Sequence, residues 1–352
     1  MARVLILNGA VVDDDAPPAS DWLASAPRGA YTTARTVAAG RRVFGLSDHA
    51  ARLAQSAALL GAPAPPAAAG VAGGSLRAAL VAGMATALRA AREVCGGERG
   101  GGDWRLTCLV TWPPLAPPPP PVAPAAAQAP FSLFVHAAPL PPRPLPPVAV
   151  LVAGEPRSLP GAKDSAWAMA GRAGLEAMRK AAGVEEVVLA TADGCALIEG
   201  LSSNFAVLEM PAAVSGAGGG GEGSNNNRSN SALLLPTLVA PGAASGALTG
   251  TVRASLVTAA LAAGLAVEDR PMRVADAERW VGAFLTSTSR GALAVGEVRW
   301  PPPPPQPTSS GGPPPHPPPP HAPVILAPSD LVARLDEAVR EAMEAAGEEV
   351  EV

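Results

Sequence analysis

Two short segments of this chain constrain its fold and its chemistry more than any other part of the sequence. The first reads Pro160-Gly-Ala-Lys-Asp-Ser-Ala-Trp167 and has Lys163 at its centre. The second reads Leu197-Ile-Glu-Gly-Leu-Ser-Ser-Asn-Phe205 and carries Glu199. Between them lie a run with a helical pattern and a run rich in the β-branched residues typical of strands. A single helix and strand therefore separate the amine from the carboxylate.

Neither charged residue identifies a site alone, because lysines and glutamates are mostly solvent-exposed. A further pattern, Leu-x-x-His-x-x-Arg-Leu-x-x-Ser-Ala, occurs over residues 46–57 and includes His49 and Arg52. Ser47 and Asp48 are typical helix-start residues, so we expect this pattern on a helix that follows them.

Two more patterns follow in the second half of the chain. Residues 248–253 read Leu-Thr-Gly-Thr-Val-Arg, at the expected start of a helix that ends at Gly264. Residues 283–289 read Ala-Phe-Leu-Thr-Ser-Thr-Ser, which predicts a strand and a turn.

Together, and in this order, the motifs resemble those of the class IV, or fold-type IV, pyridoxal phosphate enzymes. That family includes branched-chain aminotransferases, D-amino acid aminotransferases and aminodeoxychorismate lyases. The resemblance covers about residues 4–299 apart from low-complexity inserts. It implies an α+β fold with a smaller N-terminal α/β domain and a larger C-terminal domain, whose mostly β core is flanked by helices.

The resemblance also implies a cofactor, pyridoxal 5'-phosphate, and a role for each main residue. Lys163 would hold the cofactor aldehyde as a Schiff base and later move a proton as a general acid–base. Glu199 would favour the protonated pyridine nitrogen, which makes the ring a better electron sink. Arg52 would grip the phosphate, a role suited to a planar cation with several donors. We assign His49 a structural role.

Other residues are expected at the cofactor by the same resemblance. Thr251 and Val252 would offer backbone N–H groups to the phosphate at a helix N-terminus. Further cofactor contacts are expected from Ser203, Asn204, Ser287 and Thr288. Tyr31 lies where some relatives place a tyrosine near the substrate carboxylate, but Thr32 replaces the acidic residue that the family usually has next.

The resemblance leaves three functions open. The first is transfer of an amino group between an amino acid and a 2-oxo acid, in a homodimer. The second is a lyase of the aminodeoxychorismate type, which expels pyruvate. The third is a scaffold or regulator that binds the cofactor without catalysis; the altered substrate loop and the inserts favour it, whereas the intact Lys163, Glu199 and Arg52 argue against it.

Composition excludes other classes of function. A formal net charge of −4 gives no electrostatic basis for binding nucleic acid or an anionic membrane, and no apolar run is long enough to span a bilayer. The three cysteines are widely spaced, so we read them as free thiols in a reducing compartment and expect no metal site. The first residues lack the pattern of a signal or transit peptide, which favours a cytoplasmic protein and leaves a plastid or mitochondrion as alternatives.

Proline- and glycine-rich tracts mark the expected domain boundaries. The expected units are an N-terminal domain (1–140), a linker (141–147), a cofactor-binding domain (148–299) with an insert (211–231), a proline-rich insert (300–323) and a closing helix with an acidic tail (324–352).

Overall fold

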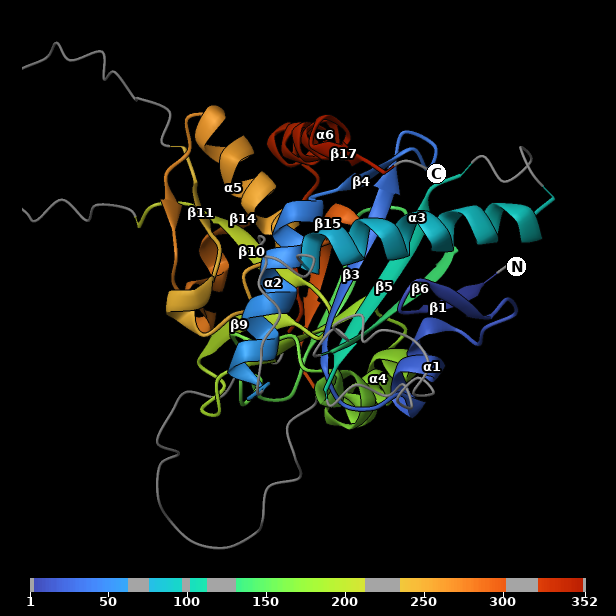
Figure 1. Ribbon diagram of the computed structural model, residues 1–352. Helices are drawn as coiled ribbons and strands as arrows, with labels where there is room; N and C mark the ends of the chain where they lie inside the picture. The colour runs from blue at the N-terminus through green and yellow to red at the C-terminus, as the bar shows by residue number, and fades with distance from the viewer. Residues whose placement is uncertain are drawn as a thin grey trace, which may run out of the picture.

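The computed structural model describes residues 3–62, 76–96, 102–112, 131–212, 235–301 and 322–350. The low-complexity inserts expected at 211–231 and 300–323, and the Ala/Pro tract at 113–130, lie almost wholly outside the described residues. The described part of the chain forms two β-sheets with helices packed against them (Figure 1).

The first sheet is antiparallel and has the strand order β17-β4-β3-β5-β6-β1-β2. Its strands are β1 (Val4–Leu7), β2 (Ala10–Asp13), β3 (Ala30–Val37), β4 (Arg42–Phe44), β5 (Trp104–Thr111), β6 (Ser132–Pro139) and β17 (Gly347–Glu349). Strands β1, β2, β3, β5 and β6 coincide with β-branched and apolar runs that the sequence predicts as strands, whereas β4 and β17 were not predicted.

Helices cover both faces of this sheet. On one face lie α2 (Leu46–Leu59) and α3 (Leu76–Val94), and on the other lies α1 (Ala19–Ser25). The apolar residues that recur every fourth position along α3 are all buried against the strands, as their spacing predicts. In Figure 1, α3 runs across the first sheet, and α2 lies beside β3.

The second sheet closes on itself. Its order is β12-β11-β10-β14-β15-β7-β8-β9-β13, and an additional pairing of β9 with β10 completes the ring. The strands are β7 (Val148–Val152), β8 (Glu186–Ala190), β9 (Ala196–Gly200), β10 (Asn204–Glu209), β11 (Thr237–Val239), β12 (Val267–Glu268), β13 (Met272–Arg273), β14 (Trp280–Ser287), β15 (Gly291–Arg299) and β16 (Val324–Ile325), which pairs with β15. Apolar side chains such as Phe205 and Leu285 fill the inside.

Two helices, α5 (Thr251–Ala262) and α6 (Asp330–Ala345), pack on the outside of this second sheet. A third, α4 (Ala173–Ala182), covers another part of it. The segment that connects β6 to β7, and so the first sheet to the second, is held against the second sheet by Arg143. The guanidinium of Arg143 donates to the carbonyl oxygens of Arg290 and Ala292 and to Asp336 of α6.

The run expected as one helix over residues 164–182 is interrupted. A π-helical turn spans Trp167–Gly171, and α4 begins only after Arg172, which has φ −111° and ψ 0°. The ring of Trp167 packs over Gly171 so closely that a Cβ there would lie 2.6 Å from it. Helical periodicity predicted the element but not this tight contact, which changes the direction of the chain.

The C-terminus differs from the expected helix with an acidic tail. After α6, β17 pairs with β4 of the first sheet, and Val350 is buried in the core beneath α2 and α3. Glu348 accepts hydrogen bonds from the backbone and hydroxyl of Ser47, in the first turn of α2, and from Arg77 of α3. The last residues therefore complete the sheet that carries α2.

Val350→Ala should lower the free energy of unfolding by about 1.5 kcal/mol, because it removes two buried carbon atoms. The matched control is Val11→Ala, since Val11 is 48% exposed and should cost less than about 0.5 kcal/mol. Urea unfolding of both variants measures the difference, and equal losses would show that the C-terminal strand does not dock on the first sheet.

Candidate active site

One cavity of about 250 Å³ lies between the two sheets and is lined by residues from both. Every residue that the sequence assigned to cofactor or substrate lines it: Tyr31, Arg52, Lys163, Glu199, Ser203, Asn204, Thr251, Val252, Ser287 and Thr288. The fold thus gathers residues that are up to 257 positions apart, from Tyr31 to Thr288, around one space.

Backbone pairing with β3 fixes the loop that carries Lys163. Tyr31 donates its N–H to the carbonyl of Lys163 at 2.9 Å, and Ser165 donates to the carbonyl of Gly29 at 3.0 Å. The N–H of Lys163 in turn donates to the hydroxyl of Ser56 on α2 at 3.0 Å. As a result the Lys163 amine lies 4.9 Å from the centre of the Tyr31 ring, inside the cavity.

The amine of Lys163 is easier to deprotonate than that of an ordinary lysine. Burial and the positive charges of Arg157, Arg52 and Arg172 lower its pKa to about 8, against a smaller opposing effect of Tyr31. Roughly one tenth of the amine is then neutral at pH 7, which makes it a usable nucleophile and base. Burial would raise the pKa of Tyr31, but the nearby cations lower it.

Glu199 is fully buried at the other side of the cavity. One carboxylate oxygen, Oε1, lies 3.0 Å from Nε of Arg157, and Oε2 accepts the N–H of Leu248 at 3.1 Å. Burial raises the pKa of Glu199, while Arg157 and the Leu248 N–H oppose that rise. Oε1 has no aligned hydrogen-bond donor among the described residues, so it can accept one from a bound molecule.

The start of α5 has the features of an anion-binding site. Within the described part of the chain no side chain caps this helix, and the N–H groups of its first turn have no intrahelical acceptor. Arg52 lies against it, since its guanidinium donates to the carbonyl of Thr249 at 2.8 Å. The hydroxyls of Thr251 and Thr286 are buried there, and neither has a hydrogen-bond partner among the residues that the structure describes. Converging donors at a helix N-terminus suit a phosphate or a carboxylate.

Ser203 and Asn204 shape the wall more than they offer free donors. The side-chain amide of Asn204 donates to the carbonyl of Leu248. A Cβ added at Gly250 would lie 2.1 Å from the side-chain oxygen of Asn204, so only glycine fits at position 250. The hydroxyl of Ser203 donates to Glu186, and a Cβ at Gly200 would lie 2.3 Å from it. The glycines of both motifs are therefore required by packing.

His49 does not line the cavity, in agreement with the structural role expected for it. It is fully buried, with Nδ1 2.8 Å from the hydroxyl of Thr32, and burial holds its pKa well below the ordinary value. Because side chains alternate along β3, Tyr31 and Thr33 face the cavity, whereas Thr32, which replaces the usual acid, faces α2.

Sequence reasoning missed three cavity-lining arginines: Arg105, Arg157 and Arg172. Burial lowers the pKa of Arg105, and its buried Nε has no hydrogen-bond partner among the described residues. The available signal was position, since Arg105 interrupts an apolar strand and Arg157 lies between a buried strand and Lys163.

Within the described ranges no group of three His, Cys, Asp or Glu side chains could hold a metal ion. No helix of the described residues is long and apolar enough to cross a membrane.

Residues 29–298 match the sequence model of the amino-transferase class IV family. No curated protein sequence matches the chain. A solved structure similar to it is a hypothetical aminotransferase from Mycobacterium tuberculosis in its PLP-bound form, which is 17% identical, with a TM-score of 0.61 over 97% of this chain and 99% of that one.

Two other solved structures are similar. A branched-chain aminotransferase from Thermoproteus uzoniensis, solved with norvaline, is 17% identical, with a TM-score of 0.58 over 98% of this chain and 96% of that one. A fold IV-transaminase from Curtobacterium pusillum is 18% identical, with a TM-score of 0.59 over 97% and 99%. The chain thus has the mixed helix-and-sheet fold of fold-type IV aminotransferases over nearly its whole length.

The lowered pKa of Lys163 predicts its chemical reactivity. Only the neutral amine attacks an amine-directed reagent, so labelling of Lys163 should fall as the pH drops below about 8 and level off above it. Trace labelling with acetic anhydride followed by peptide mapping measures this profile. The only other lysine, Lys180, is exposed on α4 and serves as the internal reference. A Lys163 profile that still rises steeply above pH 10 would contradict the assignment.

Proposed function

The chain belongs to the class IV aminotransferase family, and from this premise we propose that Lys163 carries its cofactor, pyridoxal phosphate, during transfer of an amino group between an amino acid and a 2-oxo acid. The observation that carries the proposal is that one cavity holds an amine of lowered pKa, a buried carboxylate and an anion site.

The residues present fit this cofactor. The first turn of α5 and Arg52 would hold the phosphate, with Ser287 and Thr288 on the facing turn. Glu199 has a free acceptor position on Oε1, which suits a protonated ring nitrogen. When bound, pyridoxal phosphate supplies an electron sink for the carbanion formed at the substrate α-carbon.

Lys163 has two functions in this proposal. Its neutral amine, favoured by burial and by the surrounding arginines, binds the cofactor aldehyde covalently. When it is not bonded to the cofactor, the same amine would remain in the cavity, where it could move a proton as a general acid–base. Tyr31 and Ser56 contribute by holding the lysine loop through its backbone, so that the amine keeps its place in both functions.

We place the substrate on the side of the cavity formed by the first sheet. Tyr31, Thr33, Arg105 and Thr107 line that side. Arg105 has a buried donor without a hydrogen-bond partner among the described residues, and a buried cation of that kind favours a carboxylate. Amino acids and 2-oxo acids both carry one, which makes Arg105 our candidate for the group that orients the substrate.

Borohydride should fix the cofactor to Lys163 and to no other residue. Purified protein incubated with pyridoxal phosphate and then reduced should carry the adduct on the Lys163 peptide. Lys163→Ala should abolish the adduct, whereas the matched variant Lys180→Ala should keep it, since Lys180 is exposed and outside the cavity. An adduct mapped to Lys180 in the native protein would overturn the assignment.

A half-reaction with one amino acid separates the three functions that the sequence leaves open. A transaminase leaves pyridoxamine phosphate, a lyase regenerates the aldehyde form, and a scaffold does neither. Absorbance spectra recorded over a panel of amino acids therefore test the proposed reaction, and the absence of pyridoxamine phosphate with every amino acid would contradict it.

Glu199→Gln should separate binding from catalysis. The variant keeps its shape but loses the charge that favours a protonated ring nitrogen, so half-reactions should slow roughly a hundredfold or more. Covalent attachment at Lys163 should persist, because it needs only the amine and the aldehyde. The control is Glu209→Gln, a buried glutamate paired with Arg270 and Arg279 away from the cavity. Wild-type rates in Glu199→Gln would make Glu199 a structural residue.

A further inference from the structure

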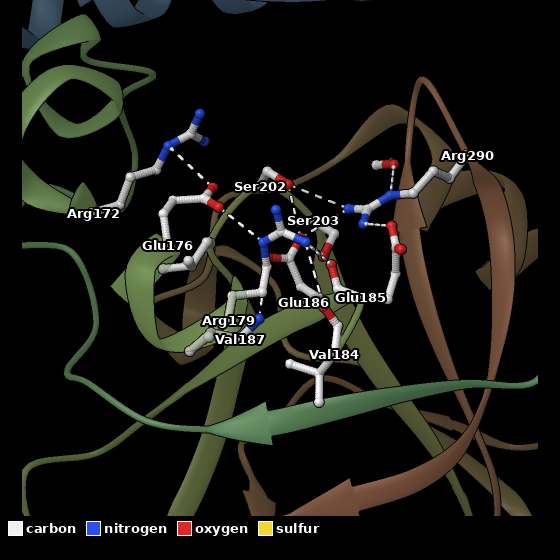
Figure 2. Close-up of polar contacts among 12 residues, drawn as sticks. Arg172, Glu176, Arg179, Val184, Glu185, Glu186, Val187, Ser202, Ser203 and Arg290 are labelled. Carbon is white, nitrogen blue, oxygen red and sulfur yellow. Dashed lines mark hydrogen bonds and ion pairs between the residues drawn. The ribbon is translucent and has the colours of Figure 1, made fainter. Parts of the chain in front are cut away.

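A buried ion pair of Arg290 and Glu186 (Figure 2) bonds to three serines that line the cavity: Ser202, Ser203 and Ser287. The guanidinium of Arg290 donates to Glu186 at 2.8 Å and to Glu185 at 2.8 Å, and its Nε donates to the hydroxyl of Ser287 at 3.1 Å. The side chains of Arg290 and Glu186 are 12% and 2% exposed, whereas that of Glu185 is 26% exposed. Burial strengthens the inner pair, because little solvent screens it.

Glu186 collects donors from a second turn of the wall. Its Oε2 accepts the hydroxyl of Ser202 at 2.7 Å and that of Ser203 at 3.2 Å, in addition to Arg290, and its Oε1 accepts the N–H of Val187. Figure 2 shows Ser202 and Ser203 beside the Glu186 carboxylate, which Arg290 also contacts directly. Burial alone would raise the pKa of Glu186, but Arg290 and the two hydroxyls outweigh it and lower the pKa.

The two turns joined in this way both line the cavity. One turn connects β9 to β10 and contains Ser202 and Ser203, and the other connects β14 to β15, where Ser287 ends β14 and Thr288 follows it. Along the chain, strands β10 to β14 and helix α5 separate the two turns. Their spacing is therefore set by Arg290 and Glu186 as well as by strand pairing.

The same contacts lead on to the start of α5. Asn204, which follows Ser203, donates to the carbonyl of Leu248 and lies against Gly250, the residue before the helix. It also pairs with Thr286 of β14. Hydrogen bonds thus join Arg290 to Glu186 and Glu186 to Ser203, and the next residue in the chain, Asn204, is bonded to the segment before α5.

We propose that Arg290 and Glu186 are positioning residues that fix the two serine-bearing turns around the phosphate of the cofactor without touching it. The inference rests on the proposed function, because it takes the anion site at α5 as the place of the phosphate. Loss of the pair should loosen the phosphate end of the cavity while leaving Lys163 and Glu199 in place.

Binding of pyridoxal phosphate and of pyridoxal, which lacks the phosphate, to the apoprotein tests this inference. Arg290→Ala should weaken binding of pyridoxal phosphate about tenfold or more, the scale of one charge-assisted hydrogen bond. Binding of pyridoxal should change less than about threefold. Arg290→Lys should recover part of the loss, because it keeps the charge but not the planar fork. Fluorescence titration gives both dissociation constants.

Two control variants distinguish positioning from loss of stability. Glu185→Gln changes only the outer, more exposed partner of Arg290 and should bind both ligands like the native protein. Arg35→Ala removes a partly buried ion pair with Asp103 in the first sheet, away from the cavity, and should lower thermal stability without changing the ratio of the two dissociation constants. If Arg290→Ala fails to fold, Glu186→Gln, which keeps the shape of the side chain, should likewise weaken binding of pyridoxal phosphate more than binding of pyridoxal.

Three results would overturn the inference. An unchanged dissociation constant for pyridoxal phosphate in Arg290→Ala and Glu186→Gln would show that the pair does not position the site. Equal weakening of both ligands would show a general structural role. Native protein that binds the two ligands equally would refute the phosphate site itself, and with it the proposed cofactor arrangement, so the two failures are distinguishable.

Discussion

The cavity depends on a short backbone pairing between the first sheet and the loop of Lys163. Ala30 and Asp164 form an antiparallel bridge, the hydrogen bonds on either side of it join residues 29–31 to 163–165, and Arg28 binds the carboxylate of Asp164. Only glycine fits at position 29, because a Cβ would lie 2.1 Å from the carbonyl oxygen of Val110. This pairing places Tyr31 of the first sheet beside the amine of Lys163, so that the first sheet forms one wall of the cavity.

The cavity that results is rich in positive charge. Its lining includes Arg52, Arg105, Arg157, Lys163 and Arg172, against the single carboxylate of Glu199. Clustered cations in a partly enclosed space attract anions such as phosphate and carboxylate groups. Burial is the main cause of the lowered pKa of Lys163, and the neighbouring arginines add to it, so the same enclosed cavity also prepares the amine as a nucleophile.

Two buried glutamates of the second sheet, Glu186 and Glu199, have different roles because their neighbours differ. Glu199 pairs with Arg157, which also lines the cavity, and its Oε1 has no aligned hydrogen-bond donor among the described residues. Oε1 can therefore accept a hydrogen bond from a ligand. Glu186, on the neighbouring strand, has both oxygens engaged by Arg290, two hydroxyls and a backbone N–H, so it can only hold structure. The free acceptor, and not burial or charge, separates a candidate catalytic group from a positioning one.

The sequence by itself indicated most of the elements and the cavity residues that lie in its ordered motifs, but not Arg105, Arg157 or Arg172, because local pattern carries only the first kind of information. Alternation and spacing of apolar residues predicted the strands and α3, and the ordered motifs identified Lys163, Glu199 and Arg52. The tertiary structure alone decided what holds them. The backbone N–H of Ser47, in the first turn of α2, donates to Glu348, about 300 residues away. Strand β17 pairs in the first sheet although its acidic sequence predicts a tail. Arg157 and Arg290 are lone arginines in the sequence, and they acquire a role only when folding buries each beside a glutamate on another segment, where low solvent screening makes the pair strong.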